Sequence, residues 1–314
     1  MSLVRTLCVV GWALAAVSAG AAFPPVVAPF APGTHKVLVD QRVSGVRRSY
    51  YVHVPPGHDG AEPLPVILAL HGAFSTAREF EAESGLSRWA DREGFLVVYP
   101  QGIGLGDLFR HWNSGPCCGK ARNLNLDDVG FALAAVEDVA RRNPVDRSRL
   151  YVVGHSNGGA LAYRIAAERP EAVAAVAVSS ASIGGTPSAG EPEWSVRRPS
   201  RSVPVLVIHG RADESIPYDG GRASQSRGKG STISAARSVD LWVEAGGCDP
   251  APRVAMMDGG RVEQRSWSGC GDGAEVVLYS LEGWGHDWPQ ADPLSGFDAA
   301  AIIGKFFQSH RRAP

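Results

Sequence analysis

Short, unbroken runs of apolar residues recur along most of this chain, separated by segments of mixed polarity. The runs span 65–70, 95–99, 150–153, 173–178, 203–208 and 276–281. Runs of this length that are rich in β-branched residues are typical of strands buried on both faces of a parallel sheet. Two further strands, over 37–43 and 48–54, are predicted to join at Ser44-Gly45. The pattern therefore predicts a mostly parallel central sheet.

Between these runs the apolar residues recur with the period of a helix. One stripe, at i, i+3, i+4, i+7, i+10 and i+11, consists of Val129, Ala132, Leu133, Val136, Val139 and Ala140. Segments 160–168 and 297–310 are also predicted to be helical. Strands that alternate with helices define the α/β class, so we expect a doubly wound sheet flanked by helices on both faces.

The first 22 residues have the pattern of a secretory signal peptide. Arg5 is the one charged residue, an apolar stretch covers 6–17, and Ala19-Gly20-Ala21 fits the small-x-small cleavage pattern. We expect cleavage, export to the periplasm or the exterior, and no stable membrane anchor. Residues 23–36 are predicted to form a loose Pro/Ala-rich lead-in, and 37–314 a single domain, which we expect to be monomeric.

Composition excludes one class of partner. Lys and Arg number 31 and Asp and Glu 32, so the formal net charge is -1. Without a basic surplus to neutralise phosphates, the chain is not expected to bind nucleic acid. The 44% hydrophobic residues suffice for a sizeable core.

The cysteines fit an oxidising compartment. Cys8 lies in the predicted signal peptide, which leaves four cysteines in the mature chain. Cys248 and Cys270 flank a segment with the pattern of a hairpin or a long loop, and we predict that they pair. The adjacent Cys117 and Cys118 could form a vicinal disulfide, pair elsewhere or stay reduced, since four cysteines allow three connectivities. Neither Cys-x-x-Cys nor a His pair at ligand spacing is present, so no metal or cofactor is predicted.

The most informative segment is Gly154-His-Ser-Asn-Gly158, which follows a predicted strand and enters a predicted helix. Gly-x-Ser-x-Gly in this setting is a nucleophile elbow, in which flanking glycines relieve the crowding of a tight turn. The following helix directs free N–H groups toward the site, which suits an oxyanion. Ser156 is therefore the predicted nucleophile.

A serine hydroxyl needs a general base, and in this kind of fold an acid and then a histidine follow the serine along the chain. Downstream of Ser156 the histidines are 209, 286 and 310. His286 follows the last predicted strand, where a loop can reach back to the serine, so we predict it as the base. Asp213 is the predicted acid, with Glu214 and Asp219 as competitors.

The oxyanion hole needs two N–H donors. We predict the backbone of Asn157 and that of Ala73, in the loop His71-Gly-Ala-Phe74. His71 is expected to pack at the strand end rather than act in catalysis. An aromatic wall for the substrate could come from Trp112, Trp284 and Trp288, although for each of them taken alone core packing is the expected role.

Taken together, these segments resemble the secreted esterases of the polyhydroxybutyrate depolymerase and feruloyl esterase group, from about residue 34 to 308. The motifs, in order, are Leu70-His-Gly72, 94–102, Trp112-Asn113 with Cys117-Cys-Gly119, 127–131, 154–159, His209-Gly-Arg-Ala-Asp213 with Pro217-Tyr218, Trp242 with Gly247-Cys248, and Gly285-His-Asp-Trp-Pro289. The resemblance implies an α/β-hydrolase with Ser156, Asp213 and His286 as its triad. It also implies a serine esterase without cofactor that acts on feruloyl or acetyl esters of plant polysaccharides, or on short hydroxyalkanoate esters.

The last motif departs from the family pattern, because Trp284 precedes it and Asp287 and Gln290 replace the usual Thr and Gly. These residues border the predicted site, so the substrate preference is open. The chain also shows no linker and separate binding module, which we take to disfavour a solid-polymer depolymerase. The alternatives are a depolymerase of hydroxybutyrate oligomers, an acyltransferase with the same triad, a peptidase and a non-catalytic binding protein.

Overall fold

The protein is described here from a computed structural model that covers residues 28–43, 46–105, 108–223, 230–290 and 296–312. The predicted signal peptide, residues 23–27 of the lead-in and the predicted turn at Ser44-Gly45 lie outside the described residues. Within the described ranges, every helix is too short or too polar to span a membrane.

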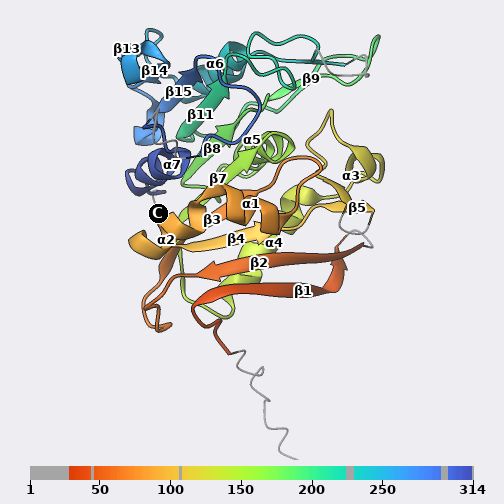
Figure 1. Ribbon diagram of the computed structural model, residues 1–314, viewed down its shortest axis with the longest axis vertical. Helices are drawn as coiled ribbons and strands as arrows, with labels where there is room; N and C mark the ends of the chain where they lie inside the picture. The colour runs from red at the N-terminus through yellow and green to blue at the C-terminus, as the bar shows by residue number, and fades with distance from the viewer. Residues whose placement is uncertain (1–27, 44–45, 106–107, 224–229, 291–295, 313–314) are drawn as a thin grey trace, which may run out of the picture.

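A ten-stranded sheet runs through the molecule in the order β1-β2-β4-β3-β7-β8-β11-β15-β14-β13 (Figure 1). Its strands are β1 (Gly33–Val43), β2 (Val46–Val54), β3 (Leu64–Leu70), β4 (Leu96–Pro100), β7 (Val145–His155), β8 (Ala175–Ser179), β11 (Val205–Gly210), β13 (Arg253–Met257), β14 (Val262–Trp267) and β15 (Val276–Leu281). The six strands from β4 to β15 are parallel, and antiparallel pairs flank them on either side. These six parallel strands coincide with the six apolar runs of the sequence.

Two details differ from the sequence-based expectation. The lead-in is not loose throughout, because β1 already begins at Gly33, which pairs with Val54 of β2. The sequence did not predict the bounds of the antiparallel strands β13 and β14, since β13 is exposed along its whole length and lacks an apolar run. This pair is the hairpin expected between Cys248 and Cys270.

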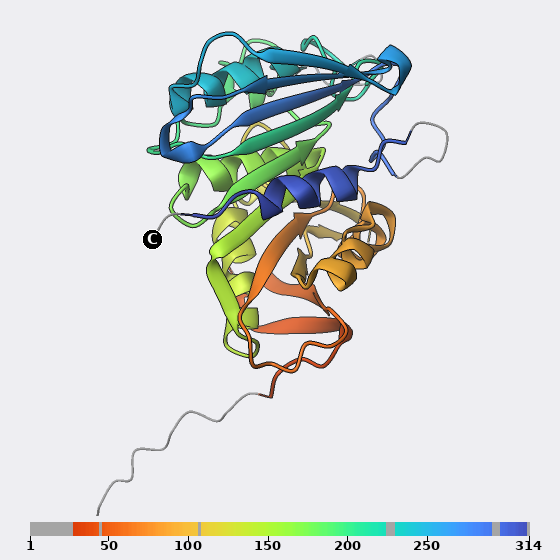
Figure 2. The same ribbon diagram turned by 90° about the vertical axis from the view of Figure 1, so that its left-hand side faces the viewer.

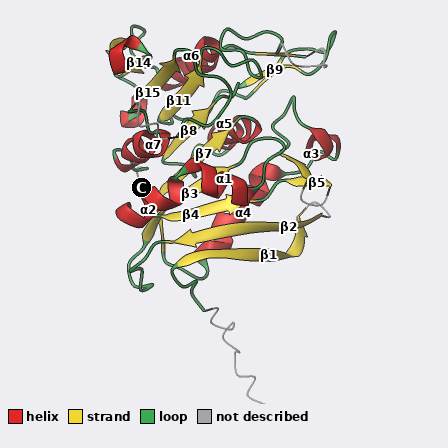
Figure 3. Ribbon diagram, in the orientation of Figure 1, coloured by secondary structure: helices red, strands yellow, loops and turns green. Residues whose placement is uncertain are grey.

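Helices cover both faces of the sheet (Figure 3). They are α1 (Ala77–Ser84), α2 (Leu86–Glu93), α3 (Gly119–Asn123), α4 (Asp128–Ala140), α5 (Asn157–Glu168), α6 (Ala235–Gly246) and α7 (Ala299–Gln308). Helices α4, α5 and α6 pack into one apolar core and α1, α2 and α7 into the other. Figure 2 shows α7 lying across one face beside α1 and α2.

Strand side chains alternate between these two cores. Along β3, Val66, Leu68 and Leu70 enter the core beneath α4 and α5, whereas Ile67 and Ala69 enter the other. All five are fully buried, as expected for a strand in the middle of a doubly wound sheet. The predicted doubly wound architecture is therefore confirmed.

Local signals start several helices. The Asp127 side chain accepts a hydrogen bond from Gly130 N–H at the start of α4, and Ser234 does the same for Arg237 N–H in α6. At α1, Thr76 and Glu79 form a capping box. These caps satisfy N–H groups that the helices themselves leave free.

Two small sheets lie outside the main one. The hairpin of β5 (Ile103–Leu105) and β6 (Leu108–His111) follows β4. The strands β9 (Gly184–Thr186), β10 (Trp194–Ser195) and β12 (Ser231–Thr232) form a separate three-stranded sheet. In the main sheet the chain passes from β3 to its neighbour β4 on one side, and then to β7 on the other side of β3. The direction of winding therefore reverses between the adjacent strands β3 and β7. Ligands of open α/β sheets bind at such a point.

Candidate active site

Ser156 occupies a sharp turn between β7 and α5. Its backbone has φ 53° and ψ −120°, a conformation that is strained for a residue with a side chain. A Cβ on Gly154 would collide with the Gly158 carbonyl, and one on Gly158 with the Leu70 carbonyl. Glycine is therefore required on both sides, because the turn packs against itself and against the end of β3.

His286 and Asp213 lie beside this serine. The Nε2 atom of His286 is 2.8 Å from Ser156 Oγ, and its Nδ1 atom is 2.8 Å from Asp213 Oδ2. The side chain of His286 is 27% exposed, whereas that of Asp213 is fully buried. The three residues predicted from the sequence thus form one continuous chain of hydrogen bonds.

The surroundings of Asp213 keep it ionised. Its Oδ1 atom accepts hydrogen bonds from the N–H groups of Ser215 and Ile216, at 2.9 and 2.8 Å. Burial raises the pKa of this carboxyl, but the contacts from His209 and His286 outweigh burial and hold the pKa well below its usual range. The histidine therefore faces a carboxylate rather than a neutral acid.

The loops that carry the histidine and the acid are joined to each other. Ala212 N–H, one residue before Asp213, donates to the Trp284 carbonyl, two residues before His286, at 2.9 Å. The competing acids predicted from sequence, Glu214 and Asp219, make no hydrogen bond to His286 within the part of the chain that the structure describes.

The two predicted oxyanion donors lie on neighbouring segments. Ala73 follows the end of β3, and Asn157 is the first residue of α5. Among the described residues, no hydrogen bond occupies the backbone N–H of either residue. Both N–H groups thus remain available to a ligand beside Ser156.

The aromatic wall predicted from sequence needs a correction. Trp112 is 0% exposed and Trp288 2% exposed, and each indole N–H donates to a backbone carbonyl inside the protein. A ring enclosed in this way cannot present a face to a substrate. Trp284 is half-buried and, of the three, alone retains accessible surface.

Sequence reasoning missed another pair of aromatic residues. Phe74 directly follows Ala73, and Phe109 lies in β6; they are 68% and 56% exposed, with ring centroids 6.0 Å apart. Both have positive φ, 66° and 53°, which is rare for bulky residues and often marks functional sites. The sequence shows that Phe74 and Phe109 each lie in a segment between predicted strands and helices, which was the available signal. It does not show that both rings would be exposed and lie next to each other.

The cysteine prediction can also be compared with the structure. Cys248 and Cys270 form a disulfide that closes the β13–β14 segment. Cys117 pairs with its neighbour Cys118. Among the described residues, no group of three His, Cys, Asp or Glu side chains could hold a metal ion.

The sheet, its helices and the elbow at the end of β7 define an α/β-hydrolase. Among solved structures, the acetyl xylan esterase from Aspergillus awamori shares this fold, with a TM-score of 0.59 over 87% of this chain and 99% of that one, at 17% identity. The family model for esterase PHB depolymerase matches residues 48–244.

Curated relatives agree with this match. The chain is 34% identical over 263 residues to NocK, a protein named as an esterase, from Nocardia uniformis subsp. tsuyamanensis, covering 79% of this chain and 72% of that one. It is 27% identical to feruloyl esterase B of Piromyces equi, covering 80% of this chain and 44% of the length of that enzyme. The chain belongs to the esterase PHB depolymerase family, and it is a carboxylic ester hydrolase.

Proposed function

We propose that this protein hydrolyses carboxylic esters through an acyl-enzyme formed on Ser156. The observation that carries the proposal is the unbroken hydrogen-bond chain from Ser156 Oγ through His286 to Asp213. Such a chain raises the nucleophilicity of a hydroxyl that is otherwise unreactive near neutral pH.

In the first half of the reaction, Ser156 Oγ attacks the ester carbonyl carbon while His286 Nε2 takes the hydroxyl proton. Asp213 stabilises the imidazolium through its bond to Nδ1. The N–H groups of Ala73 and Asn157 hold the oxyanion of the tetrahedral intermediate. His286 then gives its proton to the leaving alcohol, and the acyl group remains on Ser156.

In the second half, a water molecule takes the place of the alcohol and is deprotonated by His286. The resulting hydroxide attacks the acyl carbon, and the bond from this carbon to Ser156 Oγ then breaks as His286 returns its proton to Oγ. The carboxylic acid is released and the serine hydroxyl is restored. The partial exposure of His286 supports this step, because water must reach its Nε2 atom. An acyltransferase would instead need a site that excludes water from this atom.

The relatives suggest the substrate class. Feruloyl esterase B and acetyl xylan esterase are named for feruloyl and acetyl esters. The family whose model matches this chain is named for PHB depolymerase. We propose that the substrates are feruloyl or acetyl esters linked to plant polysaccharide, or short hydroxyalkanoate esters. The exposed pair Phe74 and Phe109 would contact the apolar part of such an ester.

We further propose that the protein acts outside the cytoplasm. The signal-peptide pattern of residues 1–22 supports export. The disulfide between Cys248 and Cys270 supports the same compartment, because such bonds persist where the surroundings are oxidising.

The test uses Ser156→Ala and, as a matched control, Ser200→Ala, since Ser200 is an exposed serine outside the site. Turnover of p-nitrophenyl acetate, methyl ferulate, acetylated xylan and 3-hydroxybutyrate oligomers is measured, together with labelling by a fluorophosphonate probe. Ser156→Ala should lose turnover by a factor of roughly a thousand or more and lose labelling, whereas the control keeps both. A folded Ser156→Ala protein with full turnover would rule out the proposed nucleophile.

A further inference from the structure

The two N–H donors proposed for the oxyanion hole belong to different segments, and a buried network connects these segments. Asn157 begins α5, whereas Ala73 lies in the loop after β3. Catalysis by such donors depends on their being fixed before the reaction, at hydrogen-bond distance from the developing charge. The contacts between the two segments would therefore fix the distance between the two donors.

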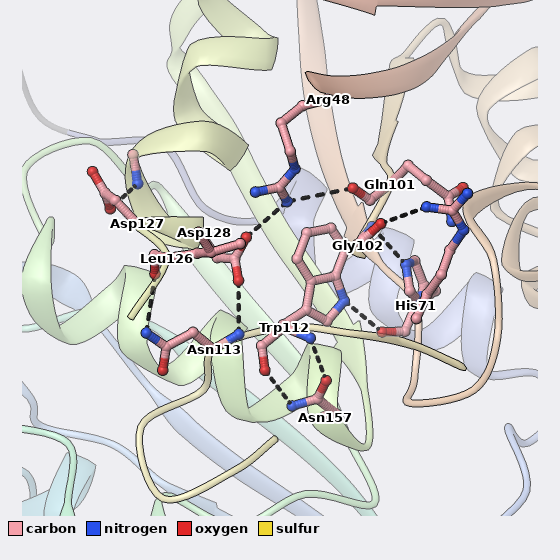
Figure 4. A network of polar contacts seen from close by, with 12 residues as sticks. Arg48, His71, Gln101, Gly102, Trp112, Asn113, Leu126, Asp127, Asp128 and Asn157 are labelled. Atoms are coloured by element: carbon pink, nitrogen blue, oxygen red, sulfur yellow. Dashed lines mark hydrogen bonds and ion pairs between the residues drawn. The ribbon is translucent and has the colours of Figure 1, made fainter. Parts of the chain in front are cut away.

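The first contact joins the Asn157 side chain to the backbone of Trp112. Asn157 Oδ1 accepts from Trp112 N–H at 2.7 Å, and its Nδ2 donates to the Trp112 carbonyl at 3.1 Å (Figure 4). The same Nδ2 also donates to Ser114 Oγ at 2.9 Å. Asn157 is 6% exposed and Trp112 is 0% exposed. A buried amide with both ends bonded holds the start of α5 against this segment.

The second contact joins the Trp112 indole to the loop after β3. Its Nε1–H donates to the His71 carbonyl at 2.9 Å (Figure 4). The backbone of Trp112 is thus attached to one half of the oxyanion hole, and its side chain to the other half. Trp112 therefore spans the gap between them.

The imidazole of His71 orients the peptide that carries the Ala73 donor. Its Nδ1–H donates to the Gly72 carbonyl at 2.7 Å, and its Nε2 accepts from Gly102 N–H at 3.0 Å. The Gly72 carbonyl and the Ala73 N–H belong to one planar trans peptide and point in opposite directions. A bond that holds this carbonyl on one side therefore directs the N–H to the other.

The network is anchored at a buried ion pair. Asp128 accepts from Asn113 N–H at 2.7 Å and from Arg48 at 2.7 Å, and the Arg48 guanidinium lies 5.8 Å from the centroid of the Trp112 ring. Both charged side chains are essentially inaccessible to solvent. Because β2, α4 and the segment after β6 meet at this pair, Trp112 has little freedom to shift.

We propose that Trp112 is a positioning residue that, with Asn157 and His71, braces the two halves of the oxyanion hole against each other. We call these three side chains the oxyanion brace. The proposal rests on the ester hydrolysis proposed above. It states that Trp112, a buried residue that does not contact the substrate, affects turnover. The brace should matter most in the tetrahedral state, because only there do both N–H groups bear on a full negative charge.

The test compares Trp112→Phe with Trp242→Phe. Phenylalanine keeps an aromatic ring and removes the indole N–H that reaches His71. Trp242 is a matched control, because it is 2% exposed and its indole N–H has no hydrogen-bond partner within the described part of the chain. The readouts are kcat and KM for p-nitrophenyl acetate and the Ki of an alkyl trifluoromethyl ketone, which Ser156 converts to a tetrahedral oxyanion. Active-site titration corrects each value for unfolded protein.

Trp112→Phe should lower kcat roughly 10- to 100-fold, with KM changed no more than about threefold. The Ki of the ketone should rise by a similar factor, because tetrahedral analogues use the same N–H groups as the transition state. Trp242→Phe should leave kcat and Ki within about twofold of the wild type. Equal values of kcat and Ki in the two variants would overturn the brace.

A second variant, Asn157→Ala, keeps the backbone donor and removes the side-chain clamp, so it tests the brace even if Trp112→Phe folds poorly. It should show the same kcat loss, and the double variant should lose little more than the worse single variant, because residues that act as one unit are not additive. Losses that multiply would contradict a shared role. Wild-type turnover and its loss in Ser156→Ala test ester hydrolysis separately. A wild type without ester turnover would overturn both proposals, whereas an active wild type with an unimpaired Trp112→Phe variant would overturn only the brace.

Discussion

Asp213 shows how the setting of one residue determines its charge and its use. The carboxyl is buried, which by itself favours the neutral acid, but two backbone N–H groups and two histidines surround it. These partners lower its pKa despite burial. The proposed mechanism needs this outcome, since only a carboxylate stabilises the imidazolium of His286.

We predict that Asp213→Asn lowers kcat by a factor of roughly a thousand or more, with little change in KM. The asparagine amide can donate to Nδ1 of His286 and so favours the tautomer with its proton on Nε2, which cannot accept the serine proton. Steady-state kinetics with p-nitrophenyl acetate measure this loss. Glu214→Gln is the control, because this neighbouring acid is exposed and does not contact His286. If Glu214→Gln caused the larger loss, the assignment of the acid would be wrong.

Individual residues of the site could be predicted from the sequence to different degrees. Ser156, Asp213 and His286 were predicted because each follows a strand and the three occur in the order that this fold requires, and the structure brings their side chains into hydrogen-bond contact. The tryptophans were not, because a sequence does not tell whether a large aromatic side chain lies in the core or at the surface. Trp112 belongs to the core, and its indole contact with His71 joins residues far apart in the chain.

At the scale of elements, the β5–β6 hairpin lies next to the loop after β3, which carries the proposed oxyanion donor Ala73. Phe74 N–H donates to the Arg110 carbonyl at 2.9 Å, so the loop after β3 and β6 are joined through their backbones. Leu105, Leu108 and Phe109 of the hairpin are all more than half exposed. Apolar side chains gathered beside a catalytic loop suggest contact with the apolar part of a substrate.

We predict that Phe109→Gly raises KM for aryl and longer acyl esters about fivefold, as expected for about 1 kcal/mol of lost apolar contact. The fold should not lose stability, because glycine accepts the left-handed backbone of this position without strain. Kinetics with methyl ferulate and thermal unfolding provide the two measurements. Met256→Ala, a loss of another exposed apolar side chain on β13, should leave KM unchanged. An unchanged KM in Phe109→Gly would exclude the hairpin from substrate contact.

At the scale of the whole molecule, folding encloses histidines that must remain neutral. Burial lowers the pKa of His71 to about 4 and that of His155 to about 3, from an ordinary value of 6.5. Neutral His71 is also required by its bonds, because Nδ1 donates while Nε2 accepts. The folded state therefore favours the neutral forms of His71 and His155.

We predict that stability falls as the pH drops from about 6.5 toward 4. In this window the unfolded chain binds a proton at His71 and the folded protein does not, so the free energy of unfolding decreases with decreasing pH. Each such histidine contributes a slope of roughly 1.4 kcal/mol per pH unit. Urea unfolding between pH 4 and 7 measures this slope.

In the same series, His71→Gln should reduce the slope by about the contribution of one histidine. Trp242→Phe, which changes no titratable group, serves as the control and should leave the slope unchanged. An identical slope in His71→Gln and in the wild type would show that His71 is not the group that takes up the proton on unfolding.

The amino-acid sequence by itself determined the parallel core of the sheet, the helical stripe of α4 and the elbow at Ser156, because apolar periodicity and glycine spacing act over a few neighbouring residues. It did not determine the strand β13, which lacks an apolar pattern, or the three-stranded sheet of β9, β10 and β12. Only the tertiary structure decided which side chains are enclosed. It buried Trp112 between the two segments that carry the proposed oxyanion donors and left Phe74 and Phe109 exposed, because burial depends on contacts between segments that are distant in the chain.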